Sequence, residues 1–270
     1  MKNKSKKLNI NLPEVTGKAE LIRYTADPET VVALAAKLCY SEDGVETLSQ
    51  KISTSDQSKF IVALKKMGHL STFEHASFTF SLTGVSRALL AQITRHRIAS
   101  FSVRSQRYVS QNKFNYIVPP AIKDLGEAAV KKFASQMDTI ATWYTEWQKD
   151  LGGKGESSNE DARFVLPNAC ETNMLVTMNA RELLHFFNLR CCFRAQWEIR
   201  DIAWQMLSQV ARIAPNLFDG AGPSCASGRC AEGAKTCGRM KEVLYKIKGE
   251  SGTGSCGRFM NTCKTDFPTE

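Results

Sequence analysis

The sequence predicts an α+β fold in which helices pack on a small, mostly antiparallel sheet. Several long segments carry apolar residues at helical spacing, and two shorter segments alternate apolar and polar residues as half-buried strands do. The chain has 270 residues, 43% of them hydrophobic and 23% charged. This balance is ordinary for a globular protein that can bury a sizeable core.

The first two expected helices are indicated by residues that are typical of helix starts and helix ends. Asp27 is followed by proline, a favoured first helical residue, and residues 29–40 have helical composition. Residues 54–68 open with a capping box, Thr54 with Gln57, and close on a glycine. Both segments are therefore predicted to be helices.

A strand and a third helix are expected next. Residues 76–84 alternate phenylalanine and leucine with small polar residues, which predicts a strand with one buried face. Ser86 then begins a segment, residues 87–97, that carries an apolar stripe of leucine and isoleucine. Arg95 and His96 are expected at the end of this helix.

The C-terminal half is predicted to be mostly helical. Residues 124–153 place large apolar side chains at helical spacing and stop at glycine, so a long amphipathic helix is expected. Residues 171–178 alternate like a strand, and Asn179 can cap a helix over residues 180–190. A further helix over residues 195–215 repeats apolar residues on one face.

Composition divides the chain into three regions. Residues 1–19 are expected to be a basic flexible tail, and residues 20–219 hold all the expected helices and strands. Residues 220–270 are rich in Gly, Cys and Lys, which indicates a less packed C-terminal appendage. No stretch is long and apolar enough to cross a bilayer, and nine cysteines without a signal peptide favour reduced thiols in the cytoplasm.

The charge of the chain favours an acidic partner. The net charge is +9 and the isoelectric point about 9.1, which suit nucleotides, nucleic acid, phosphorylated cofactors or anionic lipid.

The stretch TRHRIASFSVRSQRY, residues 94–108, interleaves arginines with serines and contains no acid. Helical spacing predicts that Gln92, Arg95 and His96 share one face. Guanidinium forks beside hydroxyls are typical of a phosphate pocket, and the alternative is that the basic residues only satisfy the negative end of a helix.

The same stretch resembles a known family. RHRIASFSVRSQR fits the R-H-R-x-x-S-x-x-x-x-S-x-R signature of the flavin-dependent thymidylate synthases at every fixed position. The segments GHLSTFEHASFTF, ARFVLP and MNARELLHFFNLRCCFRAQWEI are similar to further family motifs. The resemblance covers roughly residues 20–215.

The resemblance implies an activity and an assembly. The expected reaction is the reductive methylation of dUMP to dTMP, with methylenetetrahydrofolate as carbon donor and NADPH as reductant through bound FAD. The anions of the basic stretch are then the phosphates of FAD and dUMP. The resemblance also implies a homotetramer with active sites at subunit interfaces, and neither nucleic acid nor a membrane as partner.

Site residues are implied by the same motifs. Contacts to FAD, some through a neighbouring subunit, are expected from His69, Ser71, Arg95, His96, Arg97, Val103, Asn179, Ala180, Arg181 and His185. Binding of dUMP is expected from Gln92, Ile93, Thr94, Arg95, Val103, Arg104, Ser105, Gln106, Arg107, Arg163 and Arg190. Arg190 is expected to be catalytic, as a cation that stabilises negative charge on the uracil ring. Ser105 is expected to bind rather than to act as a nucleophile, because no histidine and acid are assigned to activate it.

Three positions depart from the family pattern. Val103 follows Ser102 where the family has Asn-Glu, so a polar contact at this position must come from the backbone. Thr72 replaces a proline, and Arg194 replaces a histidine. These changes concern details of cofactor and folate binding.

Two other classes of protein share some of these features. A single-stranded nucleic-acid-binding protein would also combine arginines with aromatic residues, here Phe101, Tyr108 and Phe114. A metal protein would use Cys225, Cys230 and Cys237, with Cys256 and Cys263 beyond, but this spacing fits no standard motif and favours free thiols. The GTGSCG segment at 252–257 lies too near the C-terminus to form a dinucleotide-binding unit.

Overall fold

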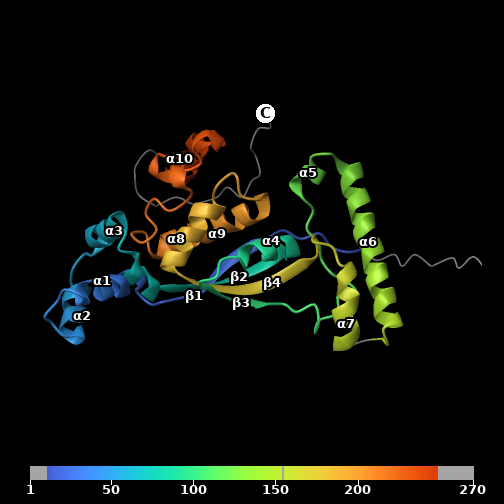
Figure 1. Ribbon diagram of the computed structural model, residues 1–270, viewed down its shortest axis with the longest axis horizontal. Helices are drawn as coiled ribbons and strands as arrows, with labels where there is room; N and C mark the ends of the chain where they lie inside the picture. The colour runs from blue at the N-terminus through green and yellow to red at the C-terminus, as the bar shows by residue number, and fades with distance from the viewer. Residues whose placement is uncertain (1–10, 154, 249–270) are drawn as a thin grey trace, which may run out of the picture. The chain divides into compact units, whose positions relative to one another are not determined.

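The computed structural model describes residues 11–153 and 155–248 (Figure 1). Its described residues form a four-stranded antiparallel sheet, so the expected α+β class is confirmed. Across this sheet the strand order is β1 (Lys18–Tyr24), β2 (Ser77–Ser86), β4 (Glu171–Asn179) and β3 (Ala99–Val103). The two strands predicted from sequence, β2 and β4, are therefore the central ones.

The helices of the described residues are of two kinds, α-helices and 3-10 helices. The α-helices are α1 (Pro28–Leu38), α2 (Val45–Ser53), α3 (Ser58–Met67), α4 (Arg87–Ile93), α5 (Pro120–Lys123), α6 (Glu127–Asp150), α7 (Glu156–Ala162), α8 (Ala180–Arg190), α9 (Trp197–Ile213) and α10 (Met240–Lys248). The short 3-10 helices are η1 (Leu70–His75), η2 (Arg163–Val165), η3 (Ser224–Ser227) and η4 (Gly233–Lys235).

The contacts within the chain separate it into two compact units. Unit 1 is made of Met1–Ala19, Ser81–Arg95 and Phe101–Val176, and unit 2 of Glu20–Phe80, His96–Ser100 and Thr177–Glu270. Helices α4 to α7 belong to unit 1, whereas α1 to α3 and α8 to α10 belong to unit 2. Each strand of the sheet begins in one unit and ends in the other.

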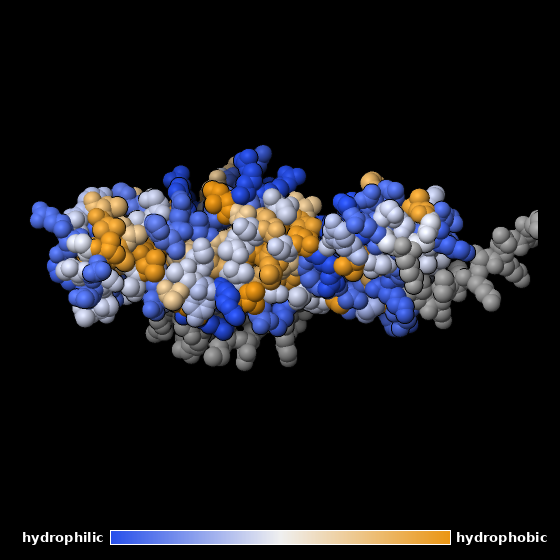
Figure 2. Space-filling view, turned by 90° about the horizontal axis from the view of Figure 1, so that it is seen from below, coloured by the Kyte–Doolittle hydropathy of each residue, from blue (hydrophilic) through white to orange (hydrophobic). Residues whose placement is uncertain are grey.

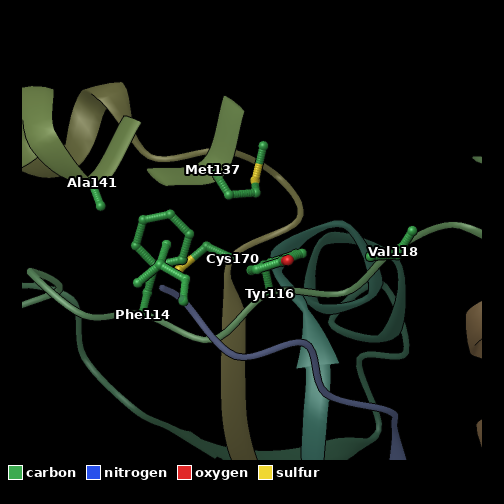
Figure 3. Packing of buried hydrophobic residues seen from close by; sticks show 7 residues of the cluster. Phe114, Tyr116, Val118, Met137, Ala141 and Cys170 are labelled. Atoms are coloured by element: carbon green, nitrogen blue, oxygen red, sulfur yellow. The ribbon is translucent and has the colours of Figure 1, made fainter. Parts of the chain in front are cut away.

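The core of unit 1 is built around α6. Met137 and Ala141 of this helix face Phe114 and Tyr116 in Figure 3, and Leu12 is buried in the same cluster. Leu12 lies in the expected tail, so part of that segment packs against the protein. Helix α7 lies beside α6 (Figure 1).

The core of unit 2 contains a row of aromatic rings. Phe78 of β2 packs on Phe218, and Phe218 packs on Phe187 of α8, with ring centroids 5.5 and 6.0 Å apart. Phe187 in turn contacts Phe186 at 5.7 Å. All three pairs meet edge to face, a favourable arrangement for aromatic rings. Helix α9, which lies beside α8, buries the apolar face predicted from its sequence except at its last residue, Ile213, which is exposed (Figure 1).

Of the four residues expected at helix starts, two cap a helix with their side chains. The side chain of Ser86 accepts a hydrogen bond from the backbone N–H of Leu89, and Asn179 accepts one from Glu182. Asp27 precedes α1 but makes no side-chain cap. The expected Thr54 capping box is wrong, because that residue follows the last turn of α2, a helix that the sequence did not predict.

The expected helix around the basic stretch is also wrong in its extent. Helix α4 ends at Ile93 rather than continuing to residue 97, and Thr94 follows it as the C-cap residue. Arg95 and His96 are therefore outside the helix, and the argument that helical spacing places them beside Gln92 fails. The serine-rich segment that follows forms β3, a strand that is not among the predicted elements.

The C-terminal appendage is described as far as residue 248. It contains η3, η4 and α10, and residues 231–238 are all exposed. Residues 1–10 of the expected tail, the 252–257 segment, Cys256 and Cys263 lie outside the described residues.

Candidate active site

A buried polar cluster in unit 2 joins His96 to two residues of α8. The His96 side chain is 3% exposed, and its Nδ1 lies 2.9 Å from Oε1 of Glu182. On the other side of the ring, Arg190 donates from Nε to Nε2 of His96 at 3.1 Å. A single imidazole therefore connects the first and last turns of α8.

The hydrogen bonds determine the protonation of this imidazole. Since the Nε–H of Arg190 can only donate, Nε2 of His96 must accept, and the ring proton lies on Nδ1 and is donated to Glu182. Burial lowers the pKa of His96, and the positive charge of Arg190 acts in the same direction, although Glu182 opposes them. His96 is therefore neutral at pH 7, and Arg190 is held by a neutral acceptor.

Aromatic packing fixes the same ring. The His96 ring meets Phe186 edge to face with centroids 4.9 Å apart, and it lies 5.8 Å from the ring of His185. Phe186 is fully buried, whereas His185 is exposed. The predicted site residues His96, His185 and Arg190 are thus brought together, although their motifs are far apart in the sequence.

A second group of predicted residues lies at the start of α8 and on η1. Arg181 forms an ion pair with Glu74 of η1 at 2.6 Å, and both side chains are about half exposed, at 52% and 47%. His69 precedes η1, Ser71 lies within it, and both are exposed. The Asn179 side chain is engaged in capping α8.

The residues at the end of α4 that are predicted to bind dUMP mostly have side chains that contact the protein itself. Gln92 donates from its side chain to the carbonyl of Ala88 at 3.2 Å. Ile93 is fully buried, so only its backbone can contact a ligand. Arg95 is exposed just beyond the helix. Within unit 1, Arg95 is the member of this group whose charged side chain faces solvent.

The turn after β3 is shaped by Ser105. Its hydroxyl accepts hydrogen bonds from the backbone N–H groups of Arg107 and Tyr108, at 3.1 and 3.4 Å. Gln106 is buried and donates to the sulfur of Cys170. Arg104 is exposed and borders a polar cavity of about 140 Å³. In this turn Ser105 and Gln106 therefore make contacts within the protein, whereas Arg104 faces solvent.

Two predicted dUMP-binding arginines meet at helix α7. Arg107 forms ion pairs with Glu156 and Glu160, the latter at 3.0 Å, and these bonds raise the pKa of its guanidinium. Arg163 donates from Nε to the backbone carbonyl of Glu160 at 3.0 Å. The pair is close in space, but the charge of Arg107 is already balanced by carboxylates.

Sequence reasoning missed Glu182 as a partner of the site. Asn179 and Glu182 have the spacing of a capping box, so the sequence does mark Glu182, but as part of a helix start. Its burial against His96 depends on a contact with a residue 86 positions away. Nothing in the local pattern predicts that contact.

A nucleic-acid-binding surface would require exposed aromatic residues near the arginines. Of the three aromatic residues that would stack with bases, Phe114 is 3% exposed and belongs to the core of unit 1. Tyr108 is exposed and Phe101 half-buried. No helix in residues 11–153 or 155–248 is long and apolar enough to cross a membrane.

Comparisons with known proteins agree with the motifs. The family model described as "Thymidylate synthase complementing protein" matches residues 20–216. A protein of Geobacter sulfurreducens named flavin-dependent thymidylate synthase is 50% identical over 228 residues, which cover 84% of this chain and 96% of that protein. Proteins with the same name from Clostridium tetani and Sulfolobus acidocaldarius are 48% and 41% identical, over 84% and 77% of this chain and 95% and 78% of their own lengths.

Proposed function

This chain belongs to the family of flavin-dependent thymidylate synthases, and we propose that it converts dUMP to dTMP by reductive methylation. Methylenetetrahydrofolate is the carbon donor in this proposal, and NADPH reduces the flavin, which is FAD. The observation that supports it best is the array of Glu182, His96 and Arg190, because it joins the signature histidine to the expected catalytic arginine.

The surface of unit 2 has the donors that an anionic dinucleotide needs. His69, Ser71, Arg97 and Arg181 are all exposed there, and guanidinium, imidazole and hydroxyl groups all donate to phosphate oxygens. When bound, the flavin supplies the redox chemistry that amino-acid side chains lack. The proposed FAD residues are His69, Ser71, Arg95, His96, Arg97, Val103, Asn179, Ala180, Arg181 and His185.

The role of His96 in this proposal is to position Arg190. Both ring nitrogens of His96 are already bonded within the protein, so it has no polar atom left for the cofactor. Asn179 likewise uses its side-chain oxygen to cap α8. Contacts from these two residues to FAD are therefore expected through ring edges or the side-chain amide group.

We assign the nucleotide phosphate to Arg107 and Arg163. The ion pairs of Arg107 with Glu156 and Glu160 are exposed, and such pairs contribute little to stability, so a phosphate can exchange with a carboxylate there. Ile93 and Gln106 are buried and would act through their backbone. The proposed dUMP residues are Gln92, Ile93, Thr94, Arg95, Val103, Arg104, Ser105, Gln106, Arg107, Arg163 and Arg190.

Arg190 has the catalytic role in this proposal. Its guanidinium stabilises the negative charge that develops on the uracil ring, and a fixed cation does this without reorganising during the reaction. The hydrogen bond to the neutral His96 fixes the plane of the guanidinium while leaving its positive charge uncompensated by that neighbour. Glu182 fixes the imidazole in turn.

A homotetramer is part of the proposal. Large hydrophobic side chains reach the surface, as the orange areas in Figure 2 show, and Tyr40, Phe164 and Leu125 are 89%, 84% and 76% exposed. Contiguous exposed apolar surface is typical of association sites, whereas single exposed apolar side chains are normal in monomers. Other copies of the chain would cover it and would complete the exposed FAD sites. The seven described cysteines are free, which suits the reducing cytoplasm.

The absorption spectrum and the product of the purified protein test this function. We expect flavin bands and formation of dTMP that stops when dUMP, methylenetetrahydrofolate or NADPH is left out. A colourless protein that binds single-stranded DNA and forms no dTMP would contradict the proposal and favour the nucleic-acid-binding alternative.

A further inference from the structure

Four cysteines of unit 2 line one small cavity. Cys192 follows α8, Cys225 lies in η3, and Cys230 and Cys237 come from the loops before α10. The cavity has a volume of about 10 Å³, which is near the smallest space that holds one water molecule. Cys192 belongs to the segment matched by the family model, whereas the other three lie beyond it.

We propose that these four thiols bind a single zinc ion that fastens the C-terminal appendage to the rest of unit 2. Four thiolates in a tetrahedron are a standard ligand set for structural zinc, and soft sulfur ligands select this ion over magnesium or calcium. The spacing of Cys225, Cys230 and Cys237 alone favours free thiols. The structure supplies the fourth ligand, Cys192, which the sequence pattern did not connect with them.

Binding requires the thiols to move closer together. Among residues 11–153 and 155–248, no group of three or more His, Cys, Asp or Glu side chains has the arrangement that holds a metal ion. The connecting loops can adjust because they contain Gly228, Gly233 and Gly238, each at positive φ with open space around the missing side chain. Zinc would thus draw together four thiols that the fold already places around one cavity.

The charges around the cavity suit a zinc tetrathiolate. Cys225 has Cys192, Cys230 and Cys237 around it in the lining of the cavity. Four thiolates would repel one another without a cation. With one divalent ion they keep two negative charges. Arg194 lines the cavity together with its ion-pair partner Glu232, Arg200 interacts with Cys192, and Arg239, which is paired with Glu242, interacts with Cys237.

A metal cross-link would add to the contacts that already hold the appendage, where Val243 of α10 is buried and Arg239 lies over the ring of Phe193. Between residues 221 and 239 the structure has only the turns η3, of four residues, and η4, of three. Residues 231–238 are exposed, so this segment buries little apolar surface. Small segments without a core are usually held by a disulfide or a metal ion. The ion pair of Arg194 with Glu232, at 3.4 Å, is exposed and contributes little.

The metal content of the full-length protein tests the proposal directly. Protein purified without chelators should contain one zinc per chain by plasma mass spectrometry. Replacement of zinc by Co²⁺ should produce thiolate-to-cobalt charge-transfer bands and the strong visible bands of tetrahedral cobalt. The double variant Cys225→Ser, Cys230→Ser should lose both the zinc and the cobalt bands. The matched control is Cys39→Ser, which changes an exposed cysteine at the end of α1 and should keep them.

Several results would overturn the proposal. Wild-type protein without stoichiometric metal and with all thiols reactive toward a thiol reagent would show four ordinary cysteines. A mass lower by two hydrogens, restored by reductant, would show a disulfide instead, and iron-sulfur bands would show a cluster. Zinc retained by the double variant would place the metal elsewhere. Because metal content is measured without an activity assay, these results are separate from those that test thymidylate formation.

Discussion

Arg190 ends α8, where the helix dipole alone would favour a positive side chain. A residue with only that function needs no buried partner. Here His96 accepts its Nε–H, and Glu182 holds the histidine from the opposite side. Two buried polar groups that orient one guanidinium favour a role in binding or catalysis for Arg190.

Replacement of Arg190 by alanine is expected to reduce dTMP formation at least tenfold to a hundredfold. A hydrogen bond to a charged group contributes about 1.5–3 kcal/mol, and one pKa unit or one factor of ten corresponds to about 1.4 kcal/mol. The variant should still bind FAD and allow NADPH to reduce it, since these steps use other residues. Flavin content, dUMP binding and dTMP formation measured on one preparation distinguish these effects.

The Arg190→Lys variant is the control that keeps the positive charge but lacks the planar guanidinium group. It should recover little activity, because an ammonium group lacks the planar geometry that His96 orients. Near-normal dTMP formation by the alanine variant would remove Arg190 from the active site.

Glu182 is expected to act through His96, as a positioning residue. The Glu182→Ala variant leaves the buried Nδ1–H of His96 without an acceptor, which should destabilise the fold by about 1–3 kcal/mol and lower dTMP formation. Glu182→Gln keeps an oxygen acceptor of the same length and should recover most of the activity. Urea unfolding and the kinetics of dTMP formation measure the two effects. Equal loss of activity in both variants would show that the negative charge itself is required.

At the scale of elements, β2 depends on one glycine for its packing in unit 1. Gly84 has φ +63, and a side chain at this position would collide with the carbonyl of Thr16. The segment before β1 therefore crosses β2 where no side chain is present. This contact explains how residues that look like a solvated tail become part of the fold.

Gly84→Ala is expected to destabilise the protein by more than its backbone conformation alone explains. A left-handed conformation costs an ordinary residue about 1–2 kcal/mol, and the collision with Thr16 adds to this. Gly220 is the matched control, since it has φ +62 but no atom within 4 Å of the missing side chain. Urea unfolding should show a larger loss for Gly84→Ala than for Gly220→Ala. Equal losses would mean that the N-terminal segment moves aside easily.

At the scale of the whole molecule, the proposed tetramer predicts complementation between inactive variants. If each FAD site takes Arg95 from one subunit and Arg181 from its neighbour, Arg95→Ala and Arg181→Ala should both be inactive alone. Co-expressed chains should regain part of the activity, because some mixed sites contain both arginines. Sedimentation should give the mass of four chains.

Two outcomes would contradict the shared site. Mixed oligomers without recovered activity would place both arginines in one chain, and a stable monomer that binds FAD stoichiometrically would exclude a site completed by another subunit. The double variant of a single chain, co-expressed with wild type, controls for simple dilution of active subunits.

The sequence by itself determined the class of fold, the central strands β2 and β4, the long helices α6, α8 and α9, and the family signature, because these features follow from local periodicity, caps and short motifs. The sequence also marks β3, although weakly, because Ala99, Phe101 and Val103 alternate with serines over only five residues.

The tertiary structure decided the features that depend on distant segments. The sequence pattern could not show that Glu182 pairs with His96, 86 positions away, or that Cys192 lies with the cysteines of the appendage. Burial of a polar side chain depends on the segments that pack around it, and the local periodicity of the sequence does not show which distant segments these are. For the same reason, only the structure places Leu12 in the core.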